Sequence, residues 1–465
     1  MSLIASIPTF SPQGYRSLPR PADPSGEENK GLILLQIDGL GYNTLKEAMD
    51  KGYAPHLKQM AESRRYTLES YSCGIPAETI PALSSMFYGV QLPANDWYSK
   101  KEKAFIDAGQ FERKVQAQAG QNGESGLTTG GTTYLSPISG GTEETAMTYS
   151  TLKENQANQG TFKTIVKEVW QDLKLLKRGG YSIAAAVYRF TRDMIKARKY
   201  LKEHRQWNTW WDKHYPIMLS LADNVFPAIA TEGVKQSMDR GLPVSYVDYT
   251  AYDEKAHYYG TNCTSAFESL KKLDSKIGEI QEKLEREHQP YNLVVFSDHG
   301  QTPSSLFKDV YGHSLNDYML KFVNQDREGK RQVGDQDIVT AHAYCLNNIY
   351  FNFKAETAGL SEIEAHEVQG KNPLAQYGNT EEIARQIASY ARVKETGDLM
   401  VFSTYESGKV LDFNDKYTLV SLHGGLGGDQ TLPFMLYDSS SGLNVSNVKQ
   451  SIQLHEKLAK MKCRV

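Results

Sequence analysis

The chain alternates short, almost wholly apolar runs with longer stretches in which apolar residues return every three or four positions. The short runs have the composition of strands buried on both faces, and they cover residues 31–37, 243–247, 291–297 and 431–437. Helical spacing fills the intervals between them, as over residues 42–50, 55–63, 82–88, 262–287 and 381–392. Strands that alternate with helices predict an α/β fold with a mainly parallel central sheet flanked by helices on both faces.

This pattern breaks off near residue 115 and returns near residue 241. Residues 117–160 are rich in glycine and threonine and poor in apolar residues, which is typical of a loop. Residues 161–214 have the spacing of long amphipathic helices and carry 13 lysine and arginine residues against 5 aspartate and glutamate residues. We therefore expect an irregular lead-in over residues 1–30 and an α/β core in two parts, residues 31–115 and 241–465. A helical cap insertion, residues 116–240, would separate the two parts.

Composition narrows the class of protein. The chain has 465 residues, of which 40% are hydrophobic and 23% charged, as in ordinary soluble globular proteins. Its net charge of -3 argues against a nucleic-acid-binding module, which would be strongly basic. Its four cysteines form no CxxC pair, which favours a reducing compartment. We see no signal peptide and no apolar run that would span a membrane, so the expected location is cytoplasmic.

Carboxylate and imidazole side chains follow two of the predicted strands directly. Asp38 comes after the strand 31–37, and the pair Asp298-His299 comes after the strand 291–297. In a parallel sheet the carboxyl ends of the strands lie at one edge, which is where such sheets bind their ligands. Carboxylate oxygen and imidazole nitrogen are both good donors to a zinc ion, so the pattern favours a metal site.

Two further segments add to this edge. Asp253 and His257 lie just beyond the strand 243–247, and their spacing of four residues puts both on one face of a helical turn. His423 lies in a glycine-rich loop late in the chain. Three carboxylates and three imidazoles are too many for one tetrahedral zinc ion, and they suit two divalent ions. Zinc is the expected metal, with manganese as the alternative, because carboxylate-rich sites tolerate it.

Thr79 is the best candidate for a nucleophile at such a site. It lies between Pro76 and Pro81, just before the predicted helix 82–88. The free N–H groups at the start of a helix favour phosphate, and a threonine hydroxyl there could attack phosphorus. The alternative is that Thr79 only caps the helix, because the same position suits a capping hydroxyl.

In their order and spacing these segments resemble the alkaline phosphatase superfamily, most closely its type I phosphodiesterase/nucleotide pyrophosphatase branch. The resemblance covers about residues 30–100 and 243–437, outside the middle insertion. It implies an alkaline phosphatase-like fold and metal-dependent hydrolysis of phosphodiester or nucleotide pyrophosphate bonds in a small phosphorylated substrate, through a phosphothreonine at Thr79. It also implies two zinc ions, one held by Asp253, His257 and His423 and the other by Asp38, Asp298 and His299.

One departure from the family concerns the residue that binds a phosphate oxygen. The family uses an asparagine, and its position falls near Lys100 in this chain. Asn95 is our candidate substitute, and Lys100 is a second candidate that would contribute positive charge. Because this departure leaves the preference for diesters or monoesters open, a phosphomonoesterase or a phosphomutase of the same superfamily is the alternative enzyme.

The basic insertion leaves an alternative from another class of protein. Its plain interpretation is a solvated cap whose charges attract an anionic substrate. The alternative is peripheral contact with an anionic membrane through residues 161–214, where Trp207, Trp210 and Trp211 lie beside basic residues. The chain would then be a non-catalytic relative that binds lipid, although the complete set of metal ligands favours the enzyme. The sequence predicts no particular oligomeric state.

Overall fold

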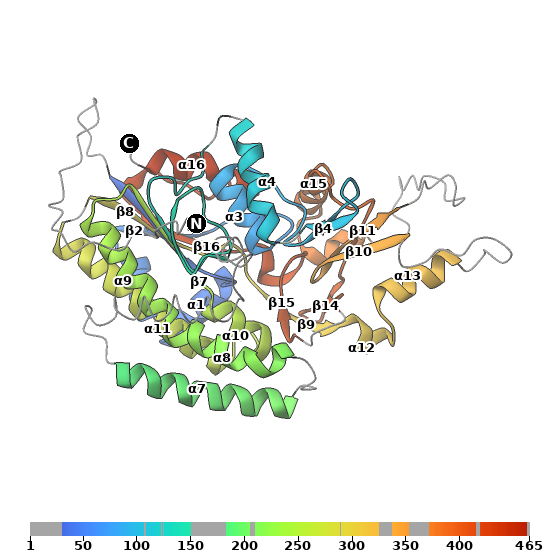
Figure 1. The fold of residues 1–465 in the computed structure, drawn as a ribbon, viewed down its shortest axis with the longest axis horizontal. Helices are drawn as coiled ribbons and strands as arrows, with labels where there is room; N and C mark the ends of the chain where they lie inside the picture. The colour runs from blue at the N-terminus through green and yellow to red at the C-terminus, as the bar shows by residue number, and fades with distance from the viewer. Residues whose placement is uncertain are drawn as a thin grey trace, which may run out of the picture.

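A seven-stranded sheet forms the centre of the molecule (Figure 1). The structure is a computed structural model, and it describes residues 30–106, 108–121, 123, 125–149, 183–204, 210–288, 290–324, 337–352, 372–414 and 419–462. In spatial order the strands are β2 (Tyr66–Ser70), β16 (Phe434–Asp438), β8 (Tyr291–Phe296), β1 (Gly31–Ile37), β7 (Val244–Tyr249), β5 (Thr132–Tyr134) and β6 (Glu144–Ala146). Six of the seven strands run in the same direction, and β16 runs antiparallel to its neighbours β8 and β2. The predicted α/β fold is therefore confirmed.

Helices cover both faces of this sheet because successive side chains of a buried strand point to opposite sides. In β1, Leu32 and Leu34 belong to one apolar cluster, and Ile33 and Leu35 belong to another. The first cluster includes residues of α3 (Thr79–Tyr88), α4 (Ala108–Gln121) and α16 (Leu454–Met461). The second includes residues of α1 (Tyr42–Asp50), α2 (Pro55–Glu62), α9 (Phe226–Asp239), α10 (Ala251–Tyr259) and α11 (Thr264–Arg286). Each face of the sheet thus has its own core.

The predicted insertion does not lie wholly outside the sheet. Strands β5 and β6 fall within residues 117–160, and β5 pairs with β7 in parallel. The interpretation of residues 117–160 as a loop is therefore wrong at these strands. Helix α9 also comes from the insertion and packs on the sheet. The boundary at residue 116 stays a prediction, but the sheet does not end there.

Helices do follow in the basic part of the insertion. α7 (Ile183–His204) and α8 (Trp210–Asn224) lie on the outer side of α10 and α11 (Figure 1). Residues 150–182 and 205–209 lie outside the described part of the chain, and Trp207 is among them. Membrane contact through residues 161–214 therefore stays a prediction. Among the described helices, none is long and apolar enough to cross a membrane.

A smaller lobe packs beside the central sheet (Figure 1). One of its sheets consists of β10 (Ile338–Ala343), β11 (Leu346–Phe351) and β12 (Leu399–Phe402). Another consists of β13 (Tyr405–Glu406), β14 (Lys409–Asp412), β9 (Thr302–Leu306) and β15 (Ser421–Leu422). The lobe also holds the hairpin β3 (Trp97–Ser99) and β4 (Ala104–Ile106), with helices α12 (Phe307–Tyr311), α13 (Leu315–Asn324) and α15 (Thr380–Tyr390).

Candidate metal centre

Parallel pairing brings the predicted ligands to one edge of the central sheet. β1 pairs with β7 on one side and with β8 on the other, and Gln36 lies opposite both Asp248 and Phe296. Asp38 and Asp298 therefore leave their strands at the same level. Helix α10 begins directly after β7, so its first turns stand over the same edge.

The first group of donors comes from the ends of β1 and β8. The donor atoms of Asp38, Asp298 and His299 lie within 4.8 Å of one another, and all three side chains are buried. Nε2 of His299 is 3.3 Å from Oδ2 of Asp298 and 3.7 Å from Oδ1 of Asp38. The Thr79 hydroxyl lies beside them, 3.1 Å from Nε2 of His299 and 3.4 Å from Oδ1 of Asp38. The predicted nucleophile and these three predicted ligands are thus in contact.

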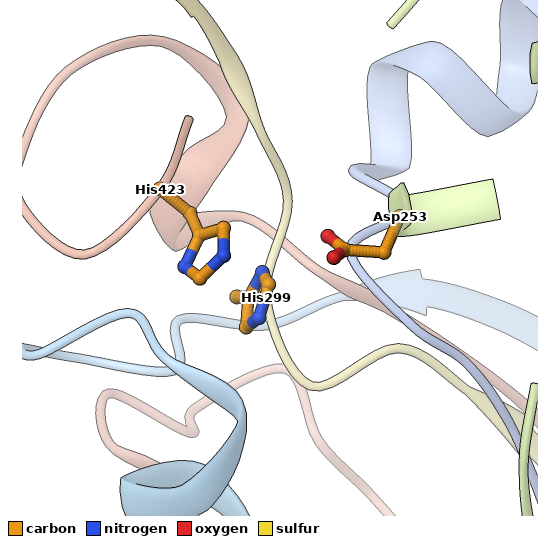
Figure 2. Close-up of side chains that lie close together, drawn as sticks. All are labelled: Asp253, His299 and His423. Carbon is orange, nitrogen blue, oxygen red and sulfur yellow. The ribbon is translucent and has the colours of Figure 1, made fainter. Parts of the chain in front are cut away.

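A second group of donors overlaps the first. The donor atoms of Asp253, His299 and His423 also lie within 4.8 Å of one another, and Figure 2 shows their side chains converging from three separate segments. The rings of His299 and His423 stack with centroids 3.9 Å apart. His257 adjoins this group, because its Nε2 lies 3.1 Å from Oδ2 of Asp253. All six predicted ligands therefore form one cluster, with His299 shared between its two halves.

The backbone fixes which nitrogen each imidazole turns toward this cluster. In all three rings Nδ1 lies within hydrogen-bond distance of a main-chain carbonyl: His257 of Ser421 at 2.8 Å, His299 of Gly300 at 3.1 Å, and His423 of Ala77 at 2.8 Å. An imidazole that donates from Nδ1 carries its lone pair on Nε2. These Nδ1 contacts, by which metal-binding histidines are usually held, turn Nε2 of His257 and of His299 toward the carboxylates of the cluster.

The electrostatics of the cluster fit divalent cations. Burial raises the pKa of Asp38 well above its ordinary value, and repulsion from Asp298 raises it further. Burial alone lowers the pKa of His257, but the Asp253 carboxylate raises it to about 9. Burial also lowers the pKa of His423 well below its ordinary value. Buried carboxylates that repel one another, with imidazole nitrogens among them, form the donor set that zinc prefers.

The start of α3 decides between the two roles considered for Thr79. The helix begins at Thr79 itself, and the residue that precedes its first turn is Glu78. Thr79 is therefore not the cap, and its hydroxyl faces Asp38 and His299 instead. Glu78 is buried, which raises its pKa to about 8, and its carboxylate accepts a hydrogen bond from the Asn95 amide at 2.8 Å.

The two candidate phosphate ligands lie in different places. Asn95 lies at the start of α3, where its Oδ1 accepts a hydrogen bond from the Ile80 amide at 3.1 Å. It is thus next to Thr79 in space, with its Nδ2 group left to donate. Lys100 instead forms an exposed ion pair with Asp398, at 2.8 Å. The structure therefore brings Asn95, and not Lys100, into contact with the first turn of α3.

Two residues support the centre without having been predicted. The Gln301 side-chain amide donates to Oδ1 of Asp253 at 2.5 Å and to its main-chain carbonyl at 3.1 Å. Gly39 has a φ of +68°, and a Cβ atom there would lie 2.0 Å from Oδ1 of Asp253. Both lie close to predicted ligands in the sequence: Gly39 directly follows Asp38, and Gln301 lies two residues after His299. That adjacency was the available signal, although sequence alone does not reveal their common contact with Asp253.

Comparisons with known proteins agree with this fold. Residues 32–424 match the family model described as type I phosphodiesterase / nucleotide pyrophosphatase. No curated protein matches the chain. Murine ectonucleotide pyrophosphatase / phosphodiesterase 5 has a similar structure, with a TM-score of 0.50 and 11% identity over 93% of this chain and 95% of that chain. The inactive form of that protein, in complex with AMP, has a TM-score of 0.50 and 10% identity over 93% of this chain and 94% of that chain. Phosphonoacetate hydrolase from Sinorhizobium meliloti 1021, in complex with phosphonoformate, has a TM-score of 0.48 and 15% identity over 94% of this chain and 97% of that chain.

Proposed function

This chain belongs to the type I phosphodiesterase / nucleotide pyrophosphatase family, whose members are phosphoric ester hydrolases, and from that premise we propose that it hydrolyses phosphodiester or nucleotide pyrophosphate bonds with Thr79 as nucleophile. The observation that carries the proposal is the contact of the Thr79 hydroxyl with His299 and Asp38 at the edge of a buried cluster of oxygen and nitrogen donors. A hydroxyl in that position serves no capping role, and activation for attack accounts for its contacts.

The donor set supports two divalent cations, with zinc as the expected metal. Asp38, Asp298 and His299 would hold one, and Asp253, His257 and His423 the other, while Gln301 fixes the Asp253 carboxylate from behind. When bound, such a pair of ions neutralises the charge that builds up on the transferred phosphoryl group. The main-chain carbonyls that hold each Nδ1 keep all three rings in the tautomer that can bind metal.

The chain's own residues would carry out the phosphoryl transfer. The Thr79 oxygen forms a bond to phosphorus as the bond from phosphorus to the leaving alkoxide breaks, and the threonine proton leaves with the first product. Water then cleaves the phosphothreonine, which restores the Thr79 hydroxyl and releases the second product. In the first turn of α3 the Ile80 and Ala82 N–H groups are already donated and Pro81 has none, so the Thr79 N–H group and Nδ2 of Asn95 would bind the phosphoryl oxygens.

A comparison of two chromogenic substrates tests this proposal. Zinc-loaded protein should hydrolyse bis-p-nitrophenyl phosphate faster than p-nitrophenyl phosphate. Thr79→Ala should lower kcat for the diester by at least about 10³-fold, because removing the nucleophile removes the covalent route. Thr79→Ser is the matched control, since it keeps the hydroxyl and should retain a measurable part of the activity.

Each component of the proposal can fail separately. Undiminished turnover by Thr79→Ala would remove the nucleophile assignment. A strong preference for the monoester would replace the diesterase by a phosphomonoesterase. Metal analysis that finds fewer than two ions per chain in active protein would contradict the double site, and manganese in place of zinc would change only the identity of the metal.

A further inference from the structure

The small lobe reaches the metal centre through one tight turn. β10 and β11 pair so that Ala343 lies opposite Leu346, which leaves Tyr344 and Cys345 as a two-residue hairpin turn. Tyr344 has a φ of +53°. Such turns usually place glycine, asparagine or aspartate at positive φ, because a bulky side chain is sterically disfavoured there. A tyrosine held in this conformation is an outlier of the kind that gathers at functional sites.

The turn is bound to the loop that carries His423. The Cys345 thiol lies 3.0 Å from the His423 carbonyl, and the Gly425 amide donates to the Cys345 sulfur at 3.2 Å. The backbones approach so closely that a Cβ atom on Gly424 would lie 2.1 Å from the Ala343 carbonyl oxygen. The position of Tyr344 is therefore set by contacts on both sides of the turn, and these contacts compensate for its disfavoured backbone conformation.

From this turn the Tyr344 ring contacts two of the predicted ligands. Its centroid is 5.0 Å from that of His423, at an interplanar angle of 64°, and 5.6 Å from that of His257, at 37°. The two imidazoles are themselves 5.1 Å apart, so the three rings pack around a common point. The main-chain carbonyls contact Nδ1 of each imidazole, and the Tyr344 ring packs against both imidazole rings. Contacts between rings at these distances and angles are favourable.

We propose that Tyr344 is a positioning residue of the metal centre, whose ring holds the imidazoles of His257 and His423 in the relative orientation in which both bind one cation with Asp253. This inference rests on the proposed metal centre and adds the small lobe to it. Glycine or asparagine would form the same turn without strain, so the turn by itself does not account for a tyrosine at this position. The ring is the feature that those residues lack.

The test compares zinc affinity across three variants, by competition with a chromogenic chelator. Tyr344→Leu removes the flat ring while keeping bulk, and it should weaken binding of one of the two zinc ions by about tenfold, as loss of a supporting contact commonly does. It should also change the visible absorption of the cobalt-substituted protein. Tyr344→Phe keeps the ring and should match the wild type in both measurements. Phe351→Leu, at the far end of the same hairpin, is the control for its stability.

The outcomes separate this inference from the proposed function. Unchanged zinc affinity and an unchanged cobalt spectrum in Tyr344→Leu would overturn the role of Tyr344. A wild-type chain that binds fewer than two ions would overturn the metal centre itself. If Tyr344→Leu does not fold, Tyr344→Gly takes its place, because glycine adopts positive φ without strain. Wild-type zinc affinity in that variant would likewise contradict the proposal.

Discussion

At the scale of single residues, Asp248 is a buried carboxyl group beside the proposed metal centre, where its charged form is unfavourable. It is fully buried in β7, opposite Gln36, and within the described residues neither of its carboxylate oxygens has a hydrogen-bond partner. Burial raises its pKa well above the ordinary value, and the nearby Asp298 and Asp253 raise it further. Because the folded state favours its protonated form, Asp248 destabilises the metal-free protein increasingly as pH rises above the ordinary carboxyl range.

Asp248→Asn should therefore stabilise the metal-free protein. The amide has nearly the same shape and no charge, so at pH 8 in the presence of a chelator the free energy of unfolding should rise by about 1–2 kcal/mol. Urea denaturation measures the change, with Asp309→Asn on the exposed surface of α12 as the control. The gain should shrink as pH falls through about 4, because Asp248 then becomes protonated in the unfolded state as well. A variant that is less stable than wild type at pH 8 would show that the charge is compensated.

The clustering of the six proposed ligands could be predicted because each follows a strand or lies in a loop whose place at the sheet edge is set by the topology. The supporting contacts could not, because they depend on atomic distances. That Gln301 meets Asp253, and that Tyr344 meets His257 and His423, follows from the packing of segments far apart in sequence. Sequence alone likewise could not predict that Asn95, and not Lys100, contacts the start of α3, because this depends on where the β3–β4 hairpin turns.

At the scale of elements, α10 connects the metal centre to the cap. Asp253 and His257 face the centre, whereas Glu254 and Lys255 contact helix α8 of the cap. Glu254 accepts a short hydrogen bond from the Tyr215 hydroxyl of α8, and the Lys255 ammonium lies 2.8 Å from the Asp223 carboxylate, also of α8. Both partners of this ion pair are buried. The orientation of α10, and so of its two ligands, therefore depends on a helix of the cap.

Asp223 is the centre of this connection. It accepts hydrogen bonds from Lys255, Lys272 and Ser269, which ties α8 to both α10 and α11. Burial by itself would raise the pKa of Asp223, but the ammonium groups of Lys255 and Lys272 lower it overall. A carboxyl group with a lowered pKa stabilises the fold above its ordinary pKa, and this contribution is lost as pH falls through the lowered value.

Asp223→Asn should lower the free energy of unfolding at pH 7 by about 3–5 kcal/mol, because it leaves the buried Lys255 without its counter-charge. The difference from wild type should narrow below about pH 4, where Asp223 becomes protonated in the unfolded state while the folded state still holds it ionised. Urea denaturation from pH 3 to pH 8 measures it. Glu279→Gln is the control and should cost less than about 1 kcal/mol, because Glu279 of α11 forms a partly exposed ion pair with Lys235 of α9. An equal loss at pH 3 and pH 7 would contradict the role of the ion pair.

At the scale of the whole molecule, the pattern of buried strands predicted the fold class but not the full extent of the sheet. β1, β7 and β8 are buried and mostly apolar, and their positions were predicted within two residues. β5 and β6 have three residues each in a glycine- and threonine-rich segment, so periodicity carries no signal for them. β5 is a strand because it pairs with the edge of β7, and β6 then pairs with β5, which is a tertiary effect. The antiparallel direction of β16 and the separate sheet around β11 are likewise invisible to local pattern.

The proposed centre is also a property of the whole chain. It joins the end of β1, the start of α3, the first turns of α10, the end of β8 and the loop after β15. No one of these segments contains a complete site, and the small lobe adds Tyr344. The central claim is that this assembly exists to let Thr79 accept a phosphoryl group from a diester.

Mass spectrometry of the protein quenched during turnover tests that claim most directly. Zinc-loaded protein mixed with bis-p-nitrophenyl phosphate and quenched in acid should carry a p-nitrophenyl phosphoryl group, formed with loss of one p-nitrophenolate. Peptide mapping should locate this group on Thr79, and Thr79→Ala should lack it. An adduct on any other residue, or continued turnover with Thr79 unmodified in every quenched sample, would contradict the account.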